Sequence, residues 1–469
     1  MLFRTQAGNV VNGIATLLNP RQTASLRSVI FEDRHAYQRE YDSTKLGAYV
    51  LEVKRLLFLH AYETVPFYHE LWRSAGLTPR DFQSTSLFEL IPSVSKAQLQ
   101  QQSKRHLLSS MSRPAALSRT SGTTARPGVH FKDERSHVLN HLTVRRYFRD
   151  HNVPTGSTVL FVHSEHGAPV RKQSVASQYF AQRVWVSVSD LIREPTVVRQ
   201  LDAEVIVGSP QQLLLLAQEI FVKGYARPPR LLVSIAERLD SNHRNTLEQL
   251  TGSAIVDVYC ASELSTLIAF ECHGYGHFHT NSDFILIEVL DADDKPTLPG
   301  EIGEVVVTDL CNFVSPLIRY RLGDLAKAAG SAGCDCGRAL PVQLGSIEGR
   351  VTDQIALDSG HTVSALPLVN ELRMQFGADF TLVQEDTNLF SFHWYESTEQ
   401  VSGEQIDAAQ KCILEYVGLN AEVRLTSSSL KDRLYVGPAK VRSFVSKAPR
   451  RESTLPKSPL SITEVTGTS

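Results

Sequence analysis

The fold is decided by a series of short runs, rich in β-branched side chains, that ends with Ala254–Tyr259 (AIVDVY). A polar or amphipathic stretch follows each run. Strands that alternate with helices are typical of a largely parallel sheet, so this part of the chain predicts an α/β fold. The four earlier runs are Ser157–Val162 (STVLFV), Arg183–Val188 (RVWVSV), Ala203–Gly208 (AEVIVG) and Arg230–Ile235 (RLLVSI).

The flanking segments predict two domains. Helix-like apolar spacing over residues 44–76 indicates a helical N-terminal region, residues 1–110. Residues 284–308 contain two strand patterns around an Asp/Pro/Gly-rich turn, which predicts a β-rich section. A smaller pattern of strands and helices after Arg350 predicts an α+β unit, and the Ser/Thr/Pro-rich end predicts disorder. We expect a large N-terminal domain (1–348), a small C-terminal domain (349–449) and a disordered tail (450–469).

Composition narrows the class of protein. The 469 residues include 21% charged residues and carry a formal net charge of −2, without the basic excess that phosphate-backbone binding needs. No apolar run approaches the roughly 18 residues of a membrane-spanning helix, and polar residues interrupt the N-terminus before a signal-like core forms. We therefore predict a cytoplasmic protein with neither nucleic acid nor membrane as a partner. Six cysteines in such a protein indicate free thiols or metal ligands.

A hydroxyl-rich stretch at residues 118–127, SRTSGTTARP, is the first chemical signal. Hydroxyls and exposed backbone N–H groups suit phosphate oxygens, and glycine allows close approach. An ordinary polar turn is the alternative, and the stretch is not a Walker loop because GxxxxGK[ST] is absent.

The segment TSGTTARP resembles the phosphate loop TSGTTGKP of adenylate-forming enzymes, with Arg126 in place of lysine and Ala125 in place of glycine. The resemblance implies that Arg126 is a catalytic cation that holds ATP phosphates. It also implies that the loop residues bind ATP: Thr120, Ser121, Gly122, Thr123 and Thr124.

Two further motifs follow in the order of that superfamily. Residues 259–263, YCASE, resemble its Y-G-x-T/S-E segment, which implies that Tyr259 stacks on adenine, that Ser262 binds ATP and that Glu263 is catalytic and holds Mg²⁺. Residues 319–325, RYRLGDL, resemble R-Y-R-T-G-D-L, which implies that Asp324 accepts hydrogen bonds from the ribose hydroxyls. A surface glutamate and an ordinary ion pair are the structural alternatives.

Two more segments resemble the mobile parts of these enzymes. Residues 349–353, GRVTD, resemble the G-R-x-D-D hinge, which implies that Arg350 lies near ATP and that the small domain rotates between two poses. Residues 437–444 resemble the loop whose lysine reaches the α-phosphate, which makes Lys440 the expected catalytic lysine. Lys447 is a competing candidate, and a surface lysine is the alternative for both.

Cysteines and a histidine between the YCASE and GRVTD segments indicate a structural zinc site. Cys334 and Cys336 form a C-x-C pair that needs two more ligands for tetrahedral Zn²⁺, and Cys272 and His279 complete a Cys₃His set. The phenylacetate-CoA-ligase-like branch pairs E-C…G-x-x-H with C-x-C-G-R in the same way. Free thiols and surface histidines are the alternative.

The N-terminal phrases TVPFYHELWRSAGL and IPSVSKAQL also resemble the phenylacetate-CoA ligase branch. The resemblance implies that the chain uses ATP and Mg²⁺ to convert a carboxylic acid into acyl-AMP and then transfers the acyl group, with the CoA thiol as the favoured acceptor. An amide-forming, coronafacate-ligase-like member would use an amino acid, and a carrier protein is a third acceptor. An inactive relative that only binds is the remaining alternative.

The acid pocket of such relatives is lined by residues before and around the tyrosine of the adenine motif. By resemblance, the pocket here includes part of a helix near 137–147, and small side chains favour room for a bulky acid. The other lining residues implied are Ile235, Val258, Cys260 and Ala261.

Overall fold

The structure is a computed structural model. It describes residues 34–83, 91–111, 116–119, 129–132, 135–163, 171–172, 182–273, 277–330, 334–357, 362–376, 379–396, 401–418, 420–429 and 443–448.

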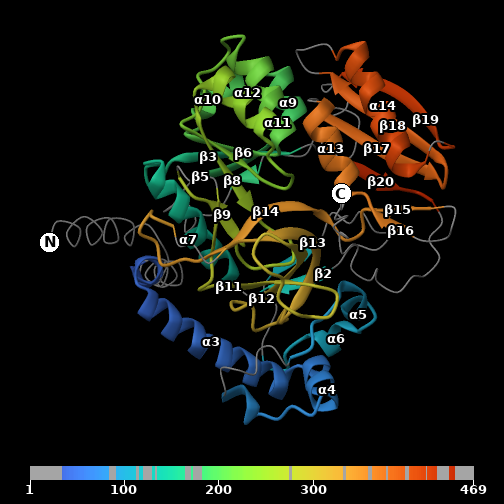
Figure 1. Cartoon of the computed structure of the whole chain (residues 1–469). Coiled ribbons are helices and arrows are strands. Elements are labelled where there is room, and N and C mark those ends of the chain that lie inside the picture. The colour runs from blue at the N-terminus through green and yellow to red at the C-terminus, as the bar shows by residue number, and fades with distance from the viewer. Residues whose placement is uncertain are drawn as a thin grey trace, which may run out of the picture.

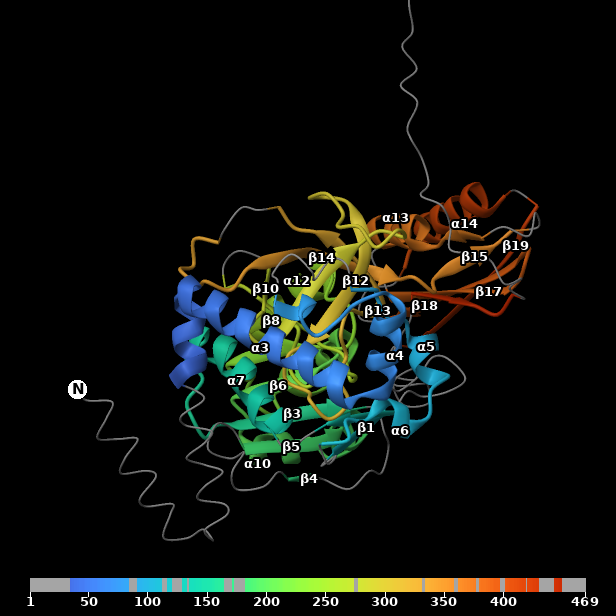
Figure 2. The ribbon, with the colours of Figure 1, turned by 90° about the horizontal axis from the view of Figure 1, so that it is seen from below.

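The N-terminal part of the described chain is helical and lies against the β-rich half of the protein (Figures 1 and 2). The side chain of Asp42 accepts a hydrogen bond from the Lys45 N–H and so begins the longest helix, which ends at Val65 where Pro66 starts the next. After a helical stretch at residues 34–41, the helices are α3 (Ser43–Thr64), α4 (Pro66–Ser74), the 3₁₀ turn η1 (Asp81–Gln83), α5 (Lys96–Gln100) and α6 (Lys104–Leu107).

The central sheet has twelve strands in the order β11-β12-β13-β14-β10-β9-β8-β7-β6-β3-β5-β4. Its parallel half confirms the α/β fold expected from the five β-branched runs. The strands of that half are β3 (Thr158–His163), β5 (Gln182–Ser187), β6 (Val205–Gly208), β7 (Leu231–Ser234) and β8 (Ala254–Tyr259), with β4 (Arg171–Lys172) antiparallel at the edge.

Helices flank the parallel strands (Figure 1). Apart from α7 (Arg135–Asp150), their buried side chains, with those of the strands, form an apolar cluster in which Leu160, Leu213 and Leu247 are fully buried. The helices are α7 (Arg135–Asp150), α9 (Val188–Arg193), α10 (Thr196–Leu201), α11 (Pro210–Leu216), the π-helical turn η3 (Ala217–Phe221) and α12 (Ser241–Thr251).

The other half of the sheet is antiparallel and contains the hairpin expected at residues 284–308. Ile285 pairs with Asp309 in that hairpin, and Gly303 lies so close to the opposite strand that a Cβ would sit 2.7 Å from the Leu290 carbonyl oxygen. The strands are β9 (Ala269–Glu271), β10 (Phe278–Thr280), β11 (Ile285–Leu290), β12 (Ile302–Asp309), β13 (Tyr320–Ala328) and β14 (Val342–Arg350).

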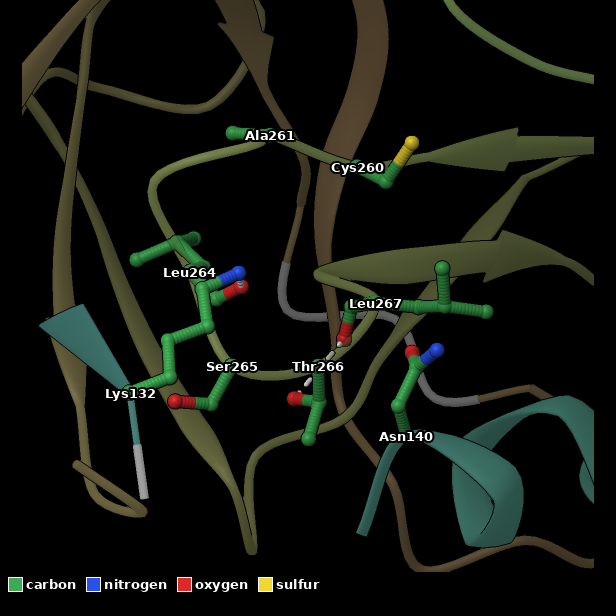
Figure 3. A pocket seen from close by; sticks show the side chains of 8 residues that line it. All are labelled: Lys132, Asn140, Cys260, Ala261, Leu264, Ser265, Thr266 and Leu267. Carbon is green, nitrogen blue, oxygen red and sulfur yellow. Dashed lines mark hydrogen bonds between the residues drawn. The ribbon is translucent and has the colours of Figure 1, made fainter. Parts of the chain in front are cut away.

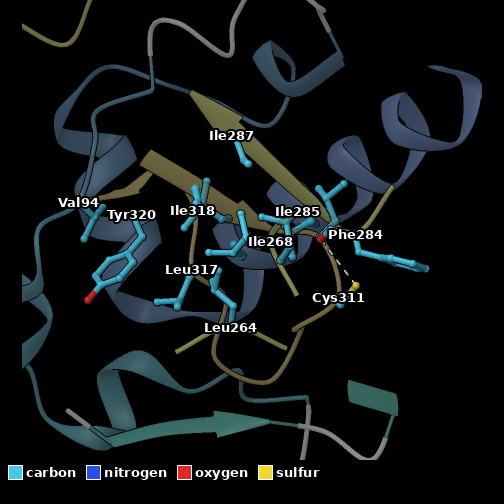
Figure 4. Packing of buried hydrophobic residues seen from close by; sticks show 14 of the residues in the cluster. Val94, Leu264, Ile268, Phe284, Ile285, Ile287, Cys311, Leu317, Ile318 and Tyr320 are labelled. Atoms are coloured by element: carbon cyan, nitrogen blue, oxygen red, sulfur yellow. Dashed lines mark hydrogen bonds between the residues drawn. The ribbon is translucent and has the colours of Figure 1, made fainter. Parts of the chain in front are cut away.

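A large apolar cluster joins this half to the N-terminal helices (Figure 4). Val94 lies beside Tyr320 of β13, and its backbone N–H donates to the Arg319 carbonyl over 2.8 Å. Trp72 of α4 and Ile318 are fully buried in the same cluster. The segment that leads into α5 is therefore fixed against β13.

The C-terminal part has a core of its own, as expected for a small α+β unit. Phe376, Phe390 and Phe392 are almost completely buried in a cluster formed only by residues 355–444. The elements are β15 (Gln354–Ala356), β16 (Thr362–Ser364), α13 (Leu366–Phe376), β17 (Asp379–Asp386), β18 (Leu389–Glu396), α14 (Gly403–Val417), β19 (Glu422–Ser429) and β20 (Phe444–Ser446).

Among the described residues, no helix is both long enough and apolar enough to cross a membrane. The cytoplasmic location stays a prediction.

A buried histidine joins the C-terminal part to the central sheet. His243 of α12 lies 2.8 Å from Asp240 through Nδ1 and 2.9 Å from Asp379 of β17 through Nε2. Burial alone would lower the pKa of His243, but the carboxylates of Asp379 and Asp240 outweigh burial and raise it well above 6.5. The imidazole is therefore charged at neutral pH and bridges the two parts.

This bridge predicts a pH-dependent stability. Because the folded-state pKa of His243 lies above its unfolded value, its contribution is complete below about pH 6.5 and is lost as the pH rises through the folded-state pKa. Asp379→Asn should lower the free energy of unfolding by about 1.5–3 kcal/mol at pH 6 and flatten its decline at higher pH. Thermal melting between pH 6 and 9 tests this, with Asp386→Asn, exposed on the same strand, as the control. Parallel curves for wild type and Asp379→Asn would contradict it.

Candidate active site

The structure brings three predicted ATP-binding residues together, although they lie far apart in the sequence. Tyr259 ends β8, and its hydroxyl donates to Asp324 Oδ2 over 2.8 Å. Asp324 of β13 pairs with Arg350, the last residue of β14, and the Arg350 Nε atom lies 3.3 Å from Asp324 Oδ1. An aromatic ring, a carboxylate and a guanidinium thus meet at one point of the sheet.

The charges in this group suit the recognition of a nucleotide. Burial and the neighbouring Asp324 carboxylate raise the pKa of Tyr259 well above 10. The hydroxyl therefore stays protonated and acts as a hydrogen-bond donor. Asp324 has a mostly buried side chain, whereas the Arg350 side chain is 44% exposed. A carboxylate only accepts hydrogen bonds, so Asp324 can receive two from a diol such as ribose.

Glu263 lies in the loop that follows Tyr259, among basic side chains. Its side chain is 13% exposed, and its Oε1 atom lies 3.8 Å from the Lys96 ammonium of α5. His130 lies in strand β2 (Val129–Lys132), and burial lowers its pKa although the Glu263 carboxylate acts in the opposite direction. A single carboxylate beside basic groups fits the usual Mg²⁺ arrangement, in which one or two carboxylates and the substrate's phosphates supply the ligands.

Lys132 of β2 holds the backbone on both sides of Glu263. Its ammonium donates to the Ser262 carbonyl over 3.0 Å and to the Leu264 carbonyl. Sequence reasoning missed both Lys132 and Lys96. Lys96 lies within the phrase IPSVSKAQL that carried part of the family resemblance, whereas no motif marked Lys132.

A cavity of about 220 Å³ opens beside this loop (Figure 3). Two of the four predicted pocket residues, Cys260 and Ala261, line it. The other two, Ile235 and Val258, contribute instead to an apolar cluster with the parallel strands. The remaining lining residues are Lys132, Asn140, Leu264, Ser265, Thr266 and Leu267.

Several predicted residues lie outside the described part of the chain. Strands β1 (Ala116–Arg119) and β2 (Val129–Lys132) pair antiparallel, with Arg119 opposite Val129, and they flank the predicted phosphate loop. The predicted residues outside the described part are Thr120, Ser121, Gly122, Thr123, Thr124, Arg126 and Lys440.

The four predicted zinc ligands also come together. The ligand atoms of Cys272, His279, Cys334 and Cys336 all lie within 4.8 Å of one another. The Cys272 and Cys334 sulfur atoms are 3.5 Å apart, and the Cys336 sulfur is 3.2 Å from His279 Nε2. Tetrahedral Zn²⁺ with bonds of about 2.3 Å to sulfur requires sulfur atoms roughly 3.8 Å apart, so the group fits this ion.

The surroundings of the four side chains also fit zinc. His279 is fully buried, and its Nδ1 atom donates to the Leu340 carbonyl over 2.8 Å, which leaves Nε2 free of hydrogen and directed at the thiols. Burial and the neighbouring thiols raise the pKa of Cys272. An ionised Cys272 thiol therefore needs a cation, which Zn²⁺ would supply.

Comparisons with known proteins show which enzymes this chain is similar to. No protein-family model matches the chain. Phenylacetate-coenzyme A ligase of Pseudomonas putida is 24% identical over 443 residues, which cover 87% of this chain and 92% of that protein. The chain is similar to phenylacetate-CoA ligases over most of its length, which supports the phenylacetate-CoA ligase-like branch of the adenylate-forming enzymes. The phenylacetate-coenzyme A ligase of Thermus thermophilus is 27% identical over 68% of this chain and 74% of its own length.

Solved structures show that the fold of this phenylacetate-CoA ligase-like protein is that of adenylate-forming ligases. 2-Hydroxyisobutyryl-CoA ligase in the postadenylation state, in complex with R3-HIB-AMP, superposes with a TM-score of 0.67 at 18% identity and covers 87% of this chain and 91% of its own. The same enzyme in the thioesterification state gives a lower TM-score of 0.55, with 88% of this chain and 92% of its own covered.

The Cys₃His group predicts a zinc-dependent stability. Cys336→Ser should reduce bound zinc from about one equivalent to a small fraction and lower the melting temperature, because a harder, neutral hydroxyl replaces a thiolate ligand. Metal analysis of the purified protein and thermal melting test this. Cys412→Ser, on α14 and outside the group, is the control and should keep both values. Purified wild-type protein with little zinc, together with a stable Cys336→Ser variant, would contradict the prediction.

Proposed function

We propose that this chain activates a carboxylic acid with ATP, forming acyl-AMP and pyrophosphate, and then transfers the acyl group to the thiol of CoA. The observation that carries the proposal is the loop at residues 259–264. Its first residue donates a hydrogen bond to Asp324, its next two line the cavity, and Glu263 follows after Ser262. One loop can therefore hold adenosine, the acid and the metal-bound phosphates side by side.

The roles of the described residues follow from their chemistry. The Tyr259 ring stacks on adenine, and Asp324 accepts hydrogen bonds from the ribose hydroxyls in place of the one it receives from Tyr259. Glu263 holds Mg²⁺, which neutralises charge on the phosphate oxygens. Lys96 lies close enough to Glu263 to bind a phosphate beside it.

The remaining roles belong to residues outside the described part. We assign the β- and γ-phosphates to Arg126 and to the loop residues Thr120–Thr124. Lys440 stabilises charge on the α-phosphate and the acid carboxylate as pyrophosphate leaves. Catalysis then consists mainly of in-line positioning and charge stabilisation, because the acid itself is the nucleophile.

The transfer step requires movement of a small domain. We propose domains at residues 1–348 and 349–449, with the hinge after Arg350, which is the last residue of β14. The separate core of the C-terminal part supports its movement as a unit. The TM-score is higher with the postadenylation-state structure, 0.67 against 0.55, which supports a conformation suited to acyl-AMP formation. Rotation about a few hinge residues would then admit CoA.

We also propose that the Cys₃His group is a structural Zn²⁺ site. All four positions are filled by protein side chains, so no coordination position is left for substrate. Zinc there holds the Cys334–Cys336 loop against β10 and takes no part in the reaction.

Two assays test the proposed reaction. Pyrophosphate exchange into ATP should depend on an added carboxylic acid, and AMP release should then rise on addition of CoA. Amino acids and a carrier protein serve as competing acceptors in the second assay. AMP release stimulated only by an amino acid would mean that the acceptor is an amine and not the CoA thiol. ATP binding without exchange for any acid would indicate an inactive relative.

The ribose contact predicts the effect of one substitution on nucleotide use. Asp324→Asn should raise the KM for ATP about 10- to 100-fold, because a charge-assisted hydrogen bond contributes about 1.5–3 kcal/mol. Tyr259→Phe keeps the ring and should change the KM less. Pyrophosphate exchange at varied ATP tests this, with Asp293→Asn, in the exposed β11–β12 turn, as the control. An unchanged KM for ATP in Asp324→Asn would show that Asp324 does not bind the ribose hydroxyls.

A further inference from the structure

The cavity beside the loop is lined by polar as well as apolar side chains. Lys132 reaches it from β2 and Asn140 from α7, on opposite sides in Figure 3. Thr266 adds a hydroxyl group. The apolar contribution comes from small or aliphatic side chains such as Ala261 and Leu264.

The Lys132 ammonium has donor capacity left for a ligand. It has three N–H donors, and the Ser262 and Leu264 carbonyls take two of them. Its carboxylate neighbour Asp309 is fully buried and already accepts from the backbone N–H groups of Ser265 and Cys311, over 2.9 Å each. Among the described residues, the Lys132 ammonium makes no hydrogen bond beyond those two, which leaves one donor for an acceptor in the cavity that its side chain lines.

Burial makes this donor selective. Burial lowers the pKa of Lys132, while the carboxylates of Asp309 and Glu263 oppose that effect and help to keep the ammonium charged. An apolar group seated against the ammonium would deprive it of water without replacing the lost hydrogen bond, which is costly. An oxygen atom in the same position would replace that bond.

Asn140 complements Lys132. Its side-chain amide can both donate and accept, so it can bind a hydroxyl, a keto oxygen or a carboxylate. Lys132 can donate to an oxygen of the same ligand, and a hydroxyl of that ligand can donate a hydrogen bond to the side-chain carbonyl oxygen of Asn140. The cavity volume of 220 Å³ equals that of about seven water molecules in the liquid, which suits a compact acid.

We propose that the acid activated by this chain is compact and carries an oxygen acceptor on its side chain, which Lys132 and Asn140 bind. Lys132 and Asn140 are thus specificity-determining residues for the acid. This inference rests on the proposed acid activation and names the class of substrate for the same site.

The test compares acids in matched pairs by pyrophosphate exchange. The pairs are butanoate with 3-hydroxybutanoate, butanoate with succinate, and phenylacetate with 4-hydroxyphenylacetate. The oxygen-bearing member of at least one pair should have a kcat/KM at least about 10-fold higher, because a site built to hydrogen-bond an oxygen rejects the analogue that lacks it.

Two variants link that preference to the cavity. Lys132→Met and Asn140→Leu should each reduce it to less than about 3-fold, mainly through loss of activity with the oxygen-bearing acid. Lys132→Met can also disturb the Glu263 loop, whose carbonyls Lys132 holds, so Asn140→Leu provides the independent test. Lys411→Met, an exposed lysine on α14, is the control.

The outcomes separate this inference from the proposed function. A preference for the apolar member of every pair, or a preference that both variants leave unchanged, would overturn the substrate class and leave acid activation intact. Absence of exchange with every acid, while ATP still binds, would overturn the proposed function and the inference with it.

Discussion

The register between β13 and β14 is the constraint on which the nucleotide site depends. It places Asp324 opposite Arg350, and the Val351 N–H donates to the Gly323 carbonyl over 2.9 Å just beyond the paired strands. Side chains alternate between the two faces of a strand, so a slip of one residue would turn Asp324 away from Tyr259. The same pairing ends where the proposed hinge begins. The proposed ribose recognition and the proposed domain movement therefore share one piece of backbone geometry.

A buried network of charges fixes the surroundings of the cavity and the Cys₃His group. Arg146 of α7, the helix that also carries Asn140, is 1% exposed and lies 2.8 Å from Asp283. Glu40 is fully buried and accepts from Arg338, two residues beyond Cys336, over 2.8 Å. Removing one partner of a buried ion pair leaves an uncompensated charge. The N-terminal helix, the cavity wall and the Cys334–Cys336 loop are thus held to one another.

Local patterns predicted the strands well, because β-branched runs and an Asp/Pro/Gly turn act within a few residues. The meeting of Tyr259 with Asp324 depends on pairing across 65 positions, and only the family resemblance indicated it. No sequence motif marks Lys132, because its hydrogen bonds are to backbone carbonyls far along the chain. Val258 packs with the apolar cluster of the parallel strands, whereas Tyr259, its neighbour, packs against the cluster shared with the N-terminal helices. Strand alternation puts adjacent residues on opposite faces, which spacing from a motif does not reveal.

In the proposed function, Lys132 connects recognition of the acid to the adenylation chemistry. Its two hydrogen bonds to the carbonyls of Ser262 and Leu264 fix the backbone on both sides of Glu263, and its side chain also lines the cavity. An acid that satisfies that donor stabilises the position of Lys132, and with it the loop that aims the Glu263 carboxylate. Binding energy from a part of the acid remote from its carboxylate would then support the geometry of the reacting phosphate. An acid without the oxygen leaves the ammonium under-bonded and the loop less well held, so poor recognition and slow adenylation would have the same physical cause.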